Sequence, residues 1–437
     1  MKTFQADVAW RIENNKGEIS MKIKQSLIAA LAVVTIALPS TVKAEPKAEV
    51  LHWWTSGGES KAVKSLMEEF KKNGGTWTDM PVAGGGGDAA MTALKARVLS
   101  GNPPTAVQLK GPSIQEWAEE GALGDLNDVG MAEKWDDVLP AQIANVMKYE
   151  GRYVATPVNV HRVDWLWANP KVLAKAGVGM PTTWSEFNDV ADKLKAKGIT
   201  PLGHGGQSWQ DATVFETVVL GLGGNDFYKK ALVDLDMSAL NSPTMVKVFD
   251  QMRRLRGYVD PNFSGRDWNL ATAMVMNGEA AFQIMGDWAK GEFLAAGKKP
   301  GTDFLCAPTP GSQGYLFNID SFAMFNVKGD DNLAGQKLLA KLIVGEGFQK
   351  TFNLIKGSVP ARLGVPMGEF EYCAHKSAYD MEATSQVGGL LPSYAHGMAL
   401  RGAQAGAITD VVTKHFNSDM SSSDAAKALA EAVKQSM

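Results

Sequence analysis

The segment from Val50 to Ser60 constrains the fold most, because it joins an apolar strand pattern to two adjacent tryptophans and a glycine turn. Successive side chains of a strand point to opposite faces, so Trp53 and Trp54 cannot both enter one core. At least one of them is expected at the carboxyl end of the strand, where open α/β sheets bind ligands. The same pattern is also compatible with two tryptophans in a core or an interface. The residues alone leave these alternatives open.

Strand and helix patterns alternate along the chain. Short apolar runs that end in turn residues predict strands, and apolar residues spaced three and four apart predict helices. The predicted strands are residues 50–54, 105–109, 163–168, 282–285 and 322–325, the predicted helices are 60–72, 89–100, 113–120 and 183–197, and the chain from 403 onwards is mostly helical. This alternation predicts an α/β fold whose open sheet has helices on both sides. Because no single linker divides the sequence, a two-domain chain would cross between its lobes more than once.

Residues 21–44 have the composition of a secretory signal peptide. Two lysines precede an apolar run at 27–38, and a small residue on either side of a lysine forms a cleavage site that ends at Ala44. We expect cleavage after Ala44. Residues 1–20 carry acidic side chains that do not suit the start of a signal peptide, so they are predicted to be a mis-assigned upstream extension, with Met21 as the true start.

Charge and hydropathy exclude some classes of protein. The net charge is -3, which gives no general electrostatic reason to bind nucleic acid or an anionic membrane. The apolar run of the signal peptide is too short to span a bilayer, and no later run approaches the required length. The absence of a cysteine at the cleavage point argues against a lipid anchor. The sequence therefore predicts an exported, folded protein.

The chain has only two cysteines, Cys306 and Cys373. In an oxidising compartment such a pair is most simply a disulfide. A redox or metal-binding pair usually has the CxxC spacing, which is missing here.

Common catalytic and cofactor motifs are absent. The glycine run at 84–87 is followed by neither Lys-Ser nor Lys-Thr and lacks the GxGxxG spacing, so it is predicted to be a loop beside a cleft. None of the six histidines belongs to an HExxH or similar pattern, and there is no GxSxG elbow. Neither a metal nor another cofactor is expected.

Several polar side chains follow predicted elements, and each has two interpretations. Glu59 either forms a capping box with Ser56 or contacts a ligand. His396 lies either on the surface at the start of a helix or in a cleft. Lys110, Asp320 and Lys356 are either solvated, as single charges in loops usually are, or contact a ligand. Considered together, tryptophans, carboxylates, lysines and amides at strand ends suit a sugar, whose hydroxyls need fixed polar partners and whose C–H faces stack on indole rings.

Eight segments in a fixed order resemble one known family. They are residues 52–59, 101–104, 108–110, 159–169, 285–288, 317–322, 356–362 and 392–398. In these segments, and over the whole mature chain, the sequence resembles the extracellular solute-binding proteins of ABC sugar importers. It is most similar to the periplasmic glucose/mannose-binding proteins of Gram-negative bacteria.

This resemblance implies a two-lobe periplasmic binding protein fold with several hinge crossings and a ligand cleft between the lobes. The implied N-lobe consists of residues 45–163 and, with the hinge, 313–365. The implied C-lobe consists of residues 164–312 and the mostly helical 366–437.

The resemblance also implies a set of sugar contacts. The aromatic residues are expected at Trp53 or Trp54 from the N-lobe and at Trp268 and Trp288 from the C-lobe. We expect one ring of the first pair to meet the sugar and the other to support its lobe. The polar contacts that carry over by motif are Glu59, Gln108, Lys110, Asp320, Lys356, His396 and Arg362. Some relatives have a histidine where Lys110 stands, which bears on the choice of sugar.

The implied function is capture of a monosaccharide, with glucose as the first candidate, by hinge closure in the periplasm. The implied partners are the permease subunits of an ABC transporter in the inner membrane, and the protein would be a monomer without catalytic activity. A second hypothesis is a secreted glycoside-cleaving enzyme that uses Glu59 and Asp320 as acid and nucleophile or base. A third is a binder of oligosaccharide.

Overall fold

The computed structural model describes residues 44–437. The predicted upstream extension and all of the predicted signal peptide except Ala44 lie outside the described residues. Within residues 44–437, none of the helices is both long enough and apolar enough to cross a membrane.

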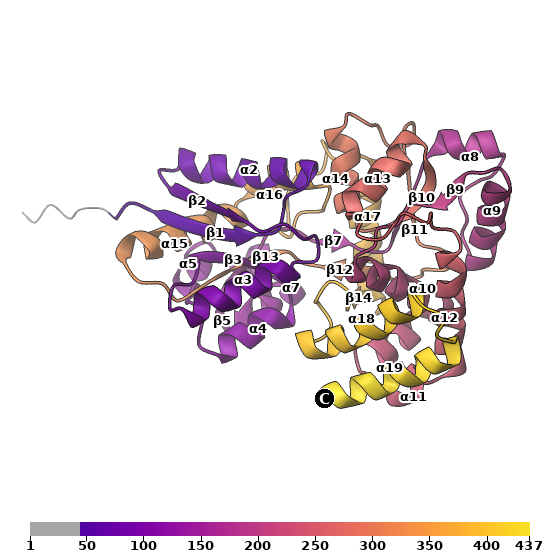
Figure 1. Cartoon of the computed structure of the whole chain (residues 1–437). Helices are drawn as coiled ribbons and strands as arrows, with labels where there is room; N and C mark the ends of the chain where they lie inside the picture. The colour runs from indigo at the N-terminus through magenta and orange to yellow at the C-terminus, as the bar shows by residue number, and fades with distance from the viewer. Residues whose placement is uncertain (1–43) are drawn as a thin grey trace, which may run out of the picture. The chain divides into compact units, whose positions relative to one another are not determined.

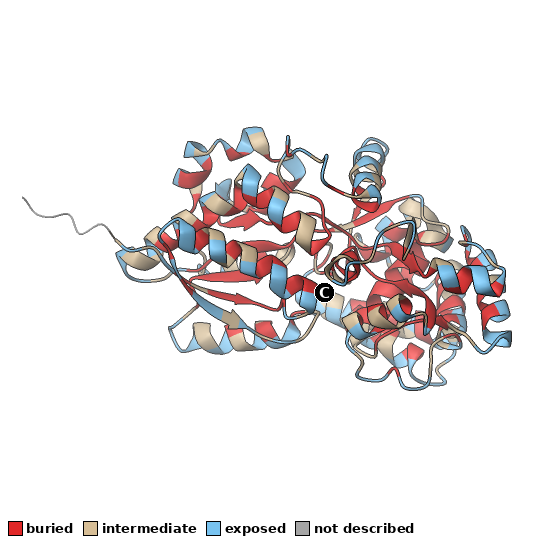
Figure 2. Ribbon diagram, turned by 90° about the horizontal axis from the view of Figure 1, so that it is seen from above, coloured by how far each residue is buried: buried red, intermediate tan, exposed pale blue. Residues whose placement is uncertain are grey.

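The first lobe is built on a five-stranded sheet. The strand order is β2 (Thr76–Pro81), β1 (Lys47–His52), β3 (Ala106–Leu109), β13 (Ser321–Met324) and β6 (Ala155–Pro157). The strands β2, β1 and β3 are parallel, whereas β13 runs antiparallel to both of its neighbours. Parallel strands need crossover helices, and these cover both faces of the sheet (Figures 1 and 2). The helices of this lobe are α2 (Gly57–Lys72), α3 (Asp88–Leu99), α4 (Pro112–Glu119), α5 (Asn127–Ala132), α6 (Trp135–Val138), α7 (Ala141–Val146), α15 (Asp330–Val344) and α16 (Glu346–Lys356).

The second lobe has a four-stranded sheet of its own. Its order is β11 (Leu305–Pro308), β8 (Trp165–Ala168), β10 (Ala280–Ile284) and β9 (Thr200–Leu202). The helices of this lobe are α8 (Pro170–Ala176), α9 (Trp184–Ala196), α10 (Ser208–Leu232), α11 (Met237–Leu240), α12 (Pro243–Arg256), α13 (Trp268–Asn277), α14 (Trp288–Ala295), α17 (Tyr372–Ser385), α18 (Gly402–Phe416) and α19 (Ser422–Ser436). The C-terminal pair α18 and α19 packs against α10 and α12 (Figure 1).

Three short strands connect the lobes. They form a separate sheet in the order β14 (Leu390–Pro392), β12 (Tyr315–Asn318) and β7 (His161–Arg162). The hydrophobic core of the first lobe draws mainly on residues from 48 to 160 and from 319 to 361. The core of the second lobe draws on residues from 163 to 316 and from 373 to 433. The chain therefore passes between the cores several times, and the predicted two-lobe α/β fold is confirmed, whereas the exact lobe boundaries stay a prediction.

Local sequence explains the element that matters most for the site. The side chain of Ser56 caps α2 by accepting a hydrogen bond from the backbone N–H of Glu59. The helix then buries Val63, Leu66 and Phe70, which are spaced three and four residues apart and share one face. This packing fixes the turn between β1 and α2 at the carboxyl end of the sheet.

The predicted disulfide is confirmed. Cys306 in β11 is bonded to Cys373 in α17, with the two Cα atoms 6.2 Å apart. The bond fastens the helix nearest the connecting strands to the sheet of the second lobe.

Candidate ligand-binding site

A polar cavity lies where both lobes meet the connecting strands. Its open volume is about 20 Å³. All of the site residues predicted from the sequence except Gln108 and Arg362 line this cavity. The full lining is Trp53, Trp54, Glu59, Gly85, Lys110, His161, Trp268, Trp288, Asn318, Asp320, Lys356 and His396.

The two adjacent tryptophans have different surroundings. The Trp54 ring packs against Phe322 and Phe352, with ring centroids 5.6 and 5.3 Å away, so it is anchored in the core of the first lobe. The Trp53 ring has the ammonium of Lys110 over it, 5.2 Å from the ring centroid. Both rings border the cavity, but Trp54 is the one that supports its lobe.

Glu59 forms an ion pair inside the cavity wall. Its Oε1 lies 2.9 Å from Nζ of Lys356, and both side chains are buried. Lys356 comes from the last turn of α16, far from Glu59 in sequence. The carboxylate is thus engaged by a lysine, while Ser56 caps the helix through its own hydroxyl. Of the two interpretations left open for Glu59, the structure favours the cavity.

Gln108 lies behind the wall and holds two of its members. Its Oε1 accepts a hydrogen bond from the backbone N–H of Trp53 at 3.1 Å, and its Nε2 donates to Oδ1 of Asp320 at 3.3 Å. Asn159 donates to the other carboxylate oxygen at 3.2 Å and accepts from the Asp320 backbone at 3.0 Å. Gln108 is fully buried, so it positions Trp53 and Asp320 and is not itself part of the cavity surface.

His161 joins the two lobes electrostatically, and the sequence analysis did not select it. Its Nδ1 contacts Asp287 and its Nε2 lies 2.9 Å from Oδ2 of Asp320. Burial alone would lower the pKa of His161, but the two carboxylates outweigh it and raise the pKa. Burial likewise opposes the charge on Asp320, yet His161 and the lysines hold the pKa of Asp320 well below its usual range. A protonated imidazole between two carboxylates follows.

In Lys110 and His396, unlike in His161, the effect of burial prevails and the pKa is lowered. Burial lowers the pKa of Lys110, with partial compensation from Asp320. Burial and the neighbouring Lys110 also lower the pKa of His396 well below its usual value, so its imidazole is neutral. Nε2 of His396 lies 2.9 Å from Oγ1 of Thr213. The loop that carries His396 is tied to α10, because Glu216 accepts hydrogen bonds from its Ser393 hydroxyl and its backbone.

The aromatic residues of the second lobe form the opposite wall. The Trp288 ring lies between His161 and His396, with centroid distances of 5.2 and 4.8 Å. Trp268 begins α13, where its carbonyl accepts from the side chain of Gln283 at 3.0 Å. The predicted glycine loop reaches this wall, because a Cβ on Gly85 would lie 2.8 Å from the Trp268 ring.

Asn318 is a further cavity residue that the sequence analysis did not select. It is 2% exposed, and its Oδ1 has no hydrogen-bond partner within residues 44–437. A buried acceptor without a partner is costly, which makes this oxygen a natural partner for a ligand hydroxyl. Both Asn318 and His161 lie inside segments that carried the family resemblance, and that position was the available signal.

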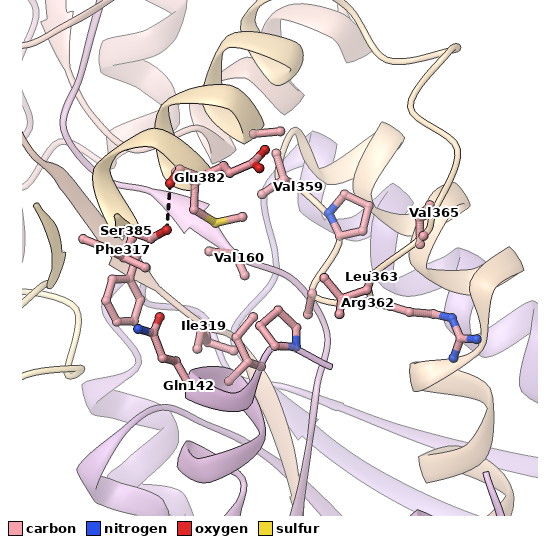
Figure 3. A pocket seen from close by; sticks show the side chains of 18 of the residues that line it. Gln142, Val160, Phe317, Ile319, Val359, Arg362, Leu363, Val365, Glu382 and Ser385 are labelled. Atoms are coloured by element: carbon pink, nitrogen blue, oxygen red, sulfur yellow. Dashed lines mark hydrogen bonds between the residues drawn. The ribbon is translucent and has the colours of Figure 1, made fainter. Parts of the chain in front are cut away.

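Arg362 does not join the cavity. Its guanidinium donates to the carbonyl of Val344 at 3.1 Å, and it borders a different and larger cavity (Figure 3). About 490 Å³ of that second cavity is open to the centre of a water molecule. Its walls are mainly aliphatic, with Val160, Ile319 and Val359 among them. Such walls cannot satisfy a ligand rich in hydroxyls, so we place the candidate site in the smaller, polar cavity.

The titratable residues give no sign of a metal centre. Within the described part of the chain, no group of three or more His, Cys, Asp or Glu side chains is arranged to hold a metal ion. Glu59 instead pairs with Lys356, and His161 pairs with Asp287 and Asp320.

Comparisons with known proteins agree with this architecture. The sequence pattern of the family described as "Bacterial extracellular solute-binding protein" matches residues 54–342. A "Probable sugar-binding periplasmic protein" of Brucella melitensis is 52% identical over 93% of this chain and 96% of its own length.

Two solved structures show the same fold. A "Chitin oligosaccharide binding protein" has a TM-score of 0.77 at 20% identity and covers 89% of this chain and 98% of its own. The bacterial solute receptor AcbH, whose structure is reported with a preference for b-D-galactopyranose, has a TM-score of 0.75 at 18% identity and covers 90% and 99%. The family match spans well over half of the chain and includes α2, β3 and the two connecting strands β7 and β12. This chain therefore belongs to the bacterial extracellular solute-binding proteins.

Proposed function

We propose that this protein binds one neutral monosaccharide in the polar cavity and delivers it to an ABC permease from the periplasm. The observation that carries the proposal is the composition of the cavity wall. Tryptophans from both lobes face the ion pairs of Glu59 with Lys356 and of His161 with Asp320, and the Oδ1 of Asn318 has no hydrogen-bond partner in the described part of the chain. A sugar offers hydroxyls for the charges and C–H faces for the rings, and few other small solutes offer both.

The charge balance supports a neutral ligand. The cavity and its immediate surroundings contain three cations, at Lys110, Lys356 and protonated His161, and three carboxylates, at Glu59, Asp287 and Asp320. A sugar acid or sugar phosphate would add an uncompensated buried charge, which is strongly unfavourable. Neutral hydroxyls can instead both donate to the carboxylates and accept from the lysines.

The volume of the cavity implies that the lobes separate to admit a ligand. Its open volume of about 20 Å³ holds about one water molecule, so even a single sugar ring requires a wider arrangement of the walls. The related fold serves proteins named for an oligosaccharide and for a monosaccharide, so the fold alone leaves the ligand length open. Glucose is the first candidate because of the sequence resemblance.

Binding by closure follows from the arrangement of the wall. Lys356 and Glu59 belong to the first lobe, Trp288 to the second, and Asp320 follows a connecting strand. A sugar that contacts all of them is favoured only when the lobes are together, so the ligand shifts the protein toward the closed arrangement. A sugar with an inverted hydroxyl leaves a buried polar group unpaired, which is how the site would discriminate.

The glycosidase alternative has weaker support. A glycosidase needs one carboxyl group with a raised pKa as its general acid. Here the pKa of Asp320 is lowered, and the carboxyl group of Glu59 is engaged by Lys356. Asp320 is therefore not set to donate a proton, and we propose that the protein has no such catalytic activity.

The test is a calorimetric titration of residues 45–437 with glucose, mannose, galactose, xylose and maltose. We expect saturable binding of one monosaccharide and weaker or undetectable binding of maltose. Tightest binding of maltose would replace the monosaccharide proposal with the oligosaccharide alternative, and release of product from an aryl glycoside would favour the enzyme. If none of the five sugars binds, the proposed function is wrong.

A further inference from the structure

We infer that Glu292, which lies outside the sugar cavity, sets sugar affinity by fastening the two lobes together in the closed protein. Glu292 is in α14 of the second lobe. Its Oε1 accepts hydrogen bonds from the hydroxyl of Ser56 and from the backbone N–H of Gly58, both at 2.7 Å. Ser56 is the N-cap of α2 in the first lobe, and Gly58 lies in the first turn of that helix. We call this contact the Glu292 latch; its effect on affinity rests on the proposed function.

The chemistry of the latch favours a carboxylate. The first N–H groups of a helix have no partner within the helix, and the helix dipole places partial positive charge there. Glu292 satisfies one of these donors from the opposite lobe. Hydrogen bonds to a charged acceptor are stronger than those between neutral groups, so one side chain can contribute substantially to closure.

Glycines make the approach possible. A Cβ on Gly58 would lie 2.9 Å from Oε1 of Glu292 and 2.9 Å from the backbone carbon of Gly291. A Cβ on Gly291 would lie 2.6 Å from the carbonyl oxygen of Lys356, which ends α16 of the first lobe. The helices α14, α2 and α16 therefore meet backbone to backbone (Figure 1). This explains Gly58, the second of the two glycines that follow the tryptophans in the sequence.

The latch is coupled to the cavity through the two helices that form it. Gly58 precedes Glu59, whose carboxylate lines the cavity, and Trp288 begins α14, one turn before Glu292. A ligand that draws Trp288 toward Glu59 brings Glu292 onto the start of α2. The latch then adds to the stability of the closed complex without touching the ligand.

A second carboxylate contact between the lobes offers a matched comparison. Glu119 in α4 pairs with Arg401, which precedes α18, at 2.6 Å. Their side chains are 44% and 50% exposed, and exposed ion pairs contribute little. Both contacts thus place a carboxylate between the lobes. Of the two, only Glu292 accepts a hydrogen bond from a backbone N–H at the start of a helix.

The experiment measures sugar affinity and dissociation rate for wild type, Glu292→Ala, Glu292→Gln and Glu119→Gln, using the sugar that wild type binds. We expect Kd to rise about 10-fold to 100-fold in Glu292→Ala, mainly through faster dissociation, because a charged hydrogen-bond acceptor is lost from the closed state only. The Kd of Glu292→Gln should fall between those of wild type and Glu292→Ala. Glu119→Gln should change Kd less than about threefold. A Kd for Glu292→Ala within twofold of wild type would overturn the inference, as would an equal effect of Glu119→Gln.

A second measurement separates failure of the latch from failure of the proposed function. If wild type binds none of the five sugars, the proposed function is wrong, and the latch is judged by amide hydrogen exchange of residues 56–60 without sugar. Loss of Gly58 protection in Glu292→Ala would support the latch. Equal protection in the two proteins would overturn it. Thermal unfolding of each variant checks that the lobes remain folded.

Discussion

The two carboxylates of the cavity, Glu59 and Asp320, are each held by residues from distant parts of the chain. Lys356 holds Glu59, and His161 holds Asp320 from one side while Gln108 holds it from the other. Bringing isolated charges out of water is costly, so these pairs make the buried polar surface possible. They also fix the directions of donors and acceptors before a ligand arrives, which reduces the ordering needed on binding.

Replacing Trp288 with alanine tests the aromatic wall. The ring is 7% exposed and lies between two cavity histidines. We expect Trp288→Ala to weaken sugar binding by about tenfold or more, because both stacking and apolar contact are lost. The matched control is Trp135→Ala, since Trp135 is fully buried in the first lobe and does not line the cavity. It should lose about 3–5 kcal/mol of stability with little change in affinity. Unchanged affinity in Trp288→Ala, with a stability loss as large as that of the control, would place the ring in the core only.

His161 should give the protein a distinctive pH dependence. Its pKa is raised in the folded protein because Asp287 and Asp320 outweigh burial. In the unfolded chain, the pKa of histidine is about 6.5. The stabilisation by His161 is therefore complete below that pH and is lost as the pH rises through the pKa of the folded state. We expect the difference in unfolding free energy between wild type and His161→Gln to shrink as pH is raised from about 6 to about 9.

The comparison with His161→Gln is needed because other groups titrate nearby. His396 has a lowered pKa in the folded protein. Its contribution to the free energy of unfolding therefore falls as the pH drops below the pKa of histidine in the unfolded chain, which is opposite to the effect of His161. Lys110 also faces the cavity. Urea unfolding of both proteins at each pH would measure the difference, and a difference that grows with pH would contradict the assignment of a protonated His161.

For the longer helices and strands, the regular spacing of apolar residues was enough to predict the type and position of the element. The predicted strand at 105–109 corresponds to β3, the helix at 183–197 to α9 and the helix at 60–72 to α2, although α2 begins three residues earlier, at Gly57. The short connecting strands β7 and β12 could not be predicted this way, because two to four residues carry no measurable period. Their partners are distant in sequence, since β12 pairs with β7 on one side and with β14 on the other. Those strands are the elements that bring His161 and Asn318 to the cavity.

The disulfide gives a prediction for the second lobe. Cys306 and Cys373 are separated by 67 residues. A disulfide that closes a loop of this length is expected to add about 4 kcal/mol to the free energy of unfolding, because it restricts the unfolded chain. The double variant Cys306→Ser with Cys373→Ser should therefore unfold at lower urea concentration than wild type. Its sugar affinity should change little, since neither cysteine lines the cavity. An unchanged urea midpoint would show that the bond adds no net stability.

At the scale of the whole molecule, the cavity is assembled from residues between Trp53 and His396. Sequence position therefore gave candidates but could not show which of them meet. Arg362 follows Lys356 closely in a segment typical of the family, yet it borders the apolar cavity instead, because the chain turns away after α16. Gln108 was selected with the cavity residues, but its burial makes it a support. Such distinctions depend on the packing of two lobes, which no local pattern encodes.

Closure itself can be tested at Gly291, where backbone from the two lobes meets. Gly291 lies inside α14, where alanine is favoured over glycine by about 0.5–1 kcal/mol, so Gly291→Ala should leave the second lobe intact or slightly stabilise it. The new Cβ would lie 2.6 Å from the Lys356 carbonyl oxygen, which belongs to the backbone and cannot move aside easily. We therefore expect weaker sugar binding, and a smaller decrease in radius of gyration on adding sugar than wild type shows by small-angle scattering. Gly297→Ala is unsuitable as a control because of its positive φ, whereas Gly347→Ala has open space around its Cβ and should behave as wild type. Equal affinity and equal compaction in Gly291→Ala would mean that the protein binds sugar without bringing α14 against α16.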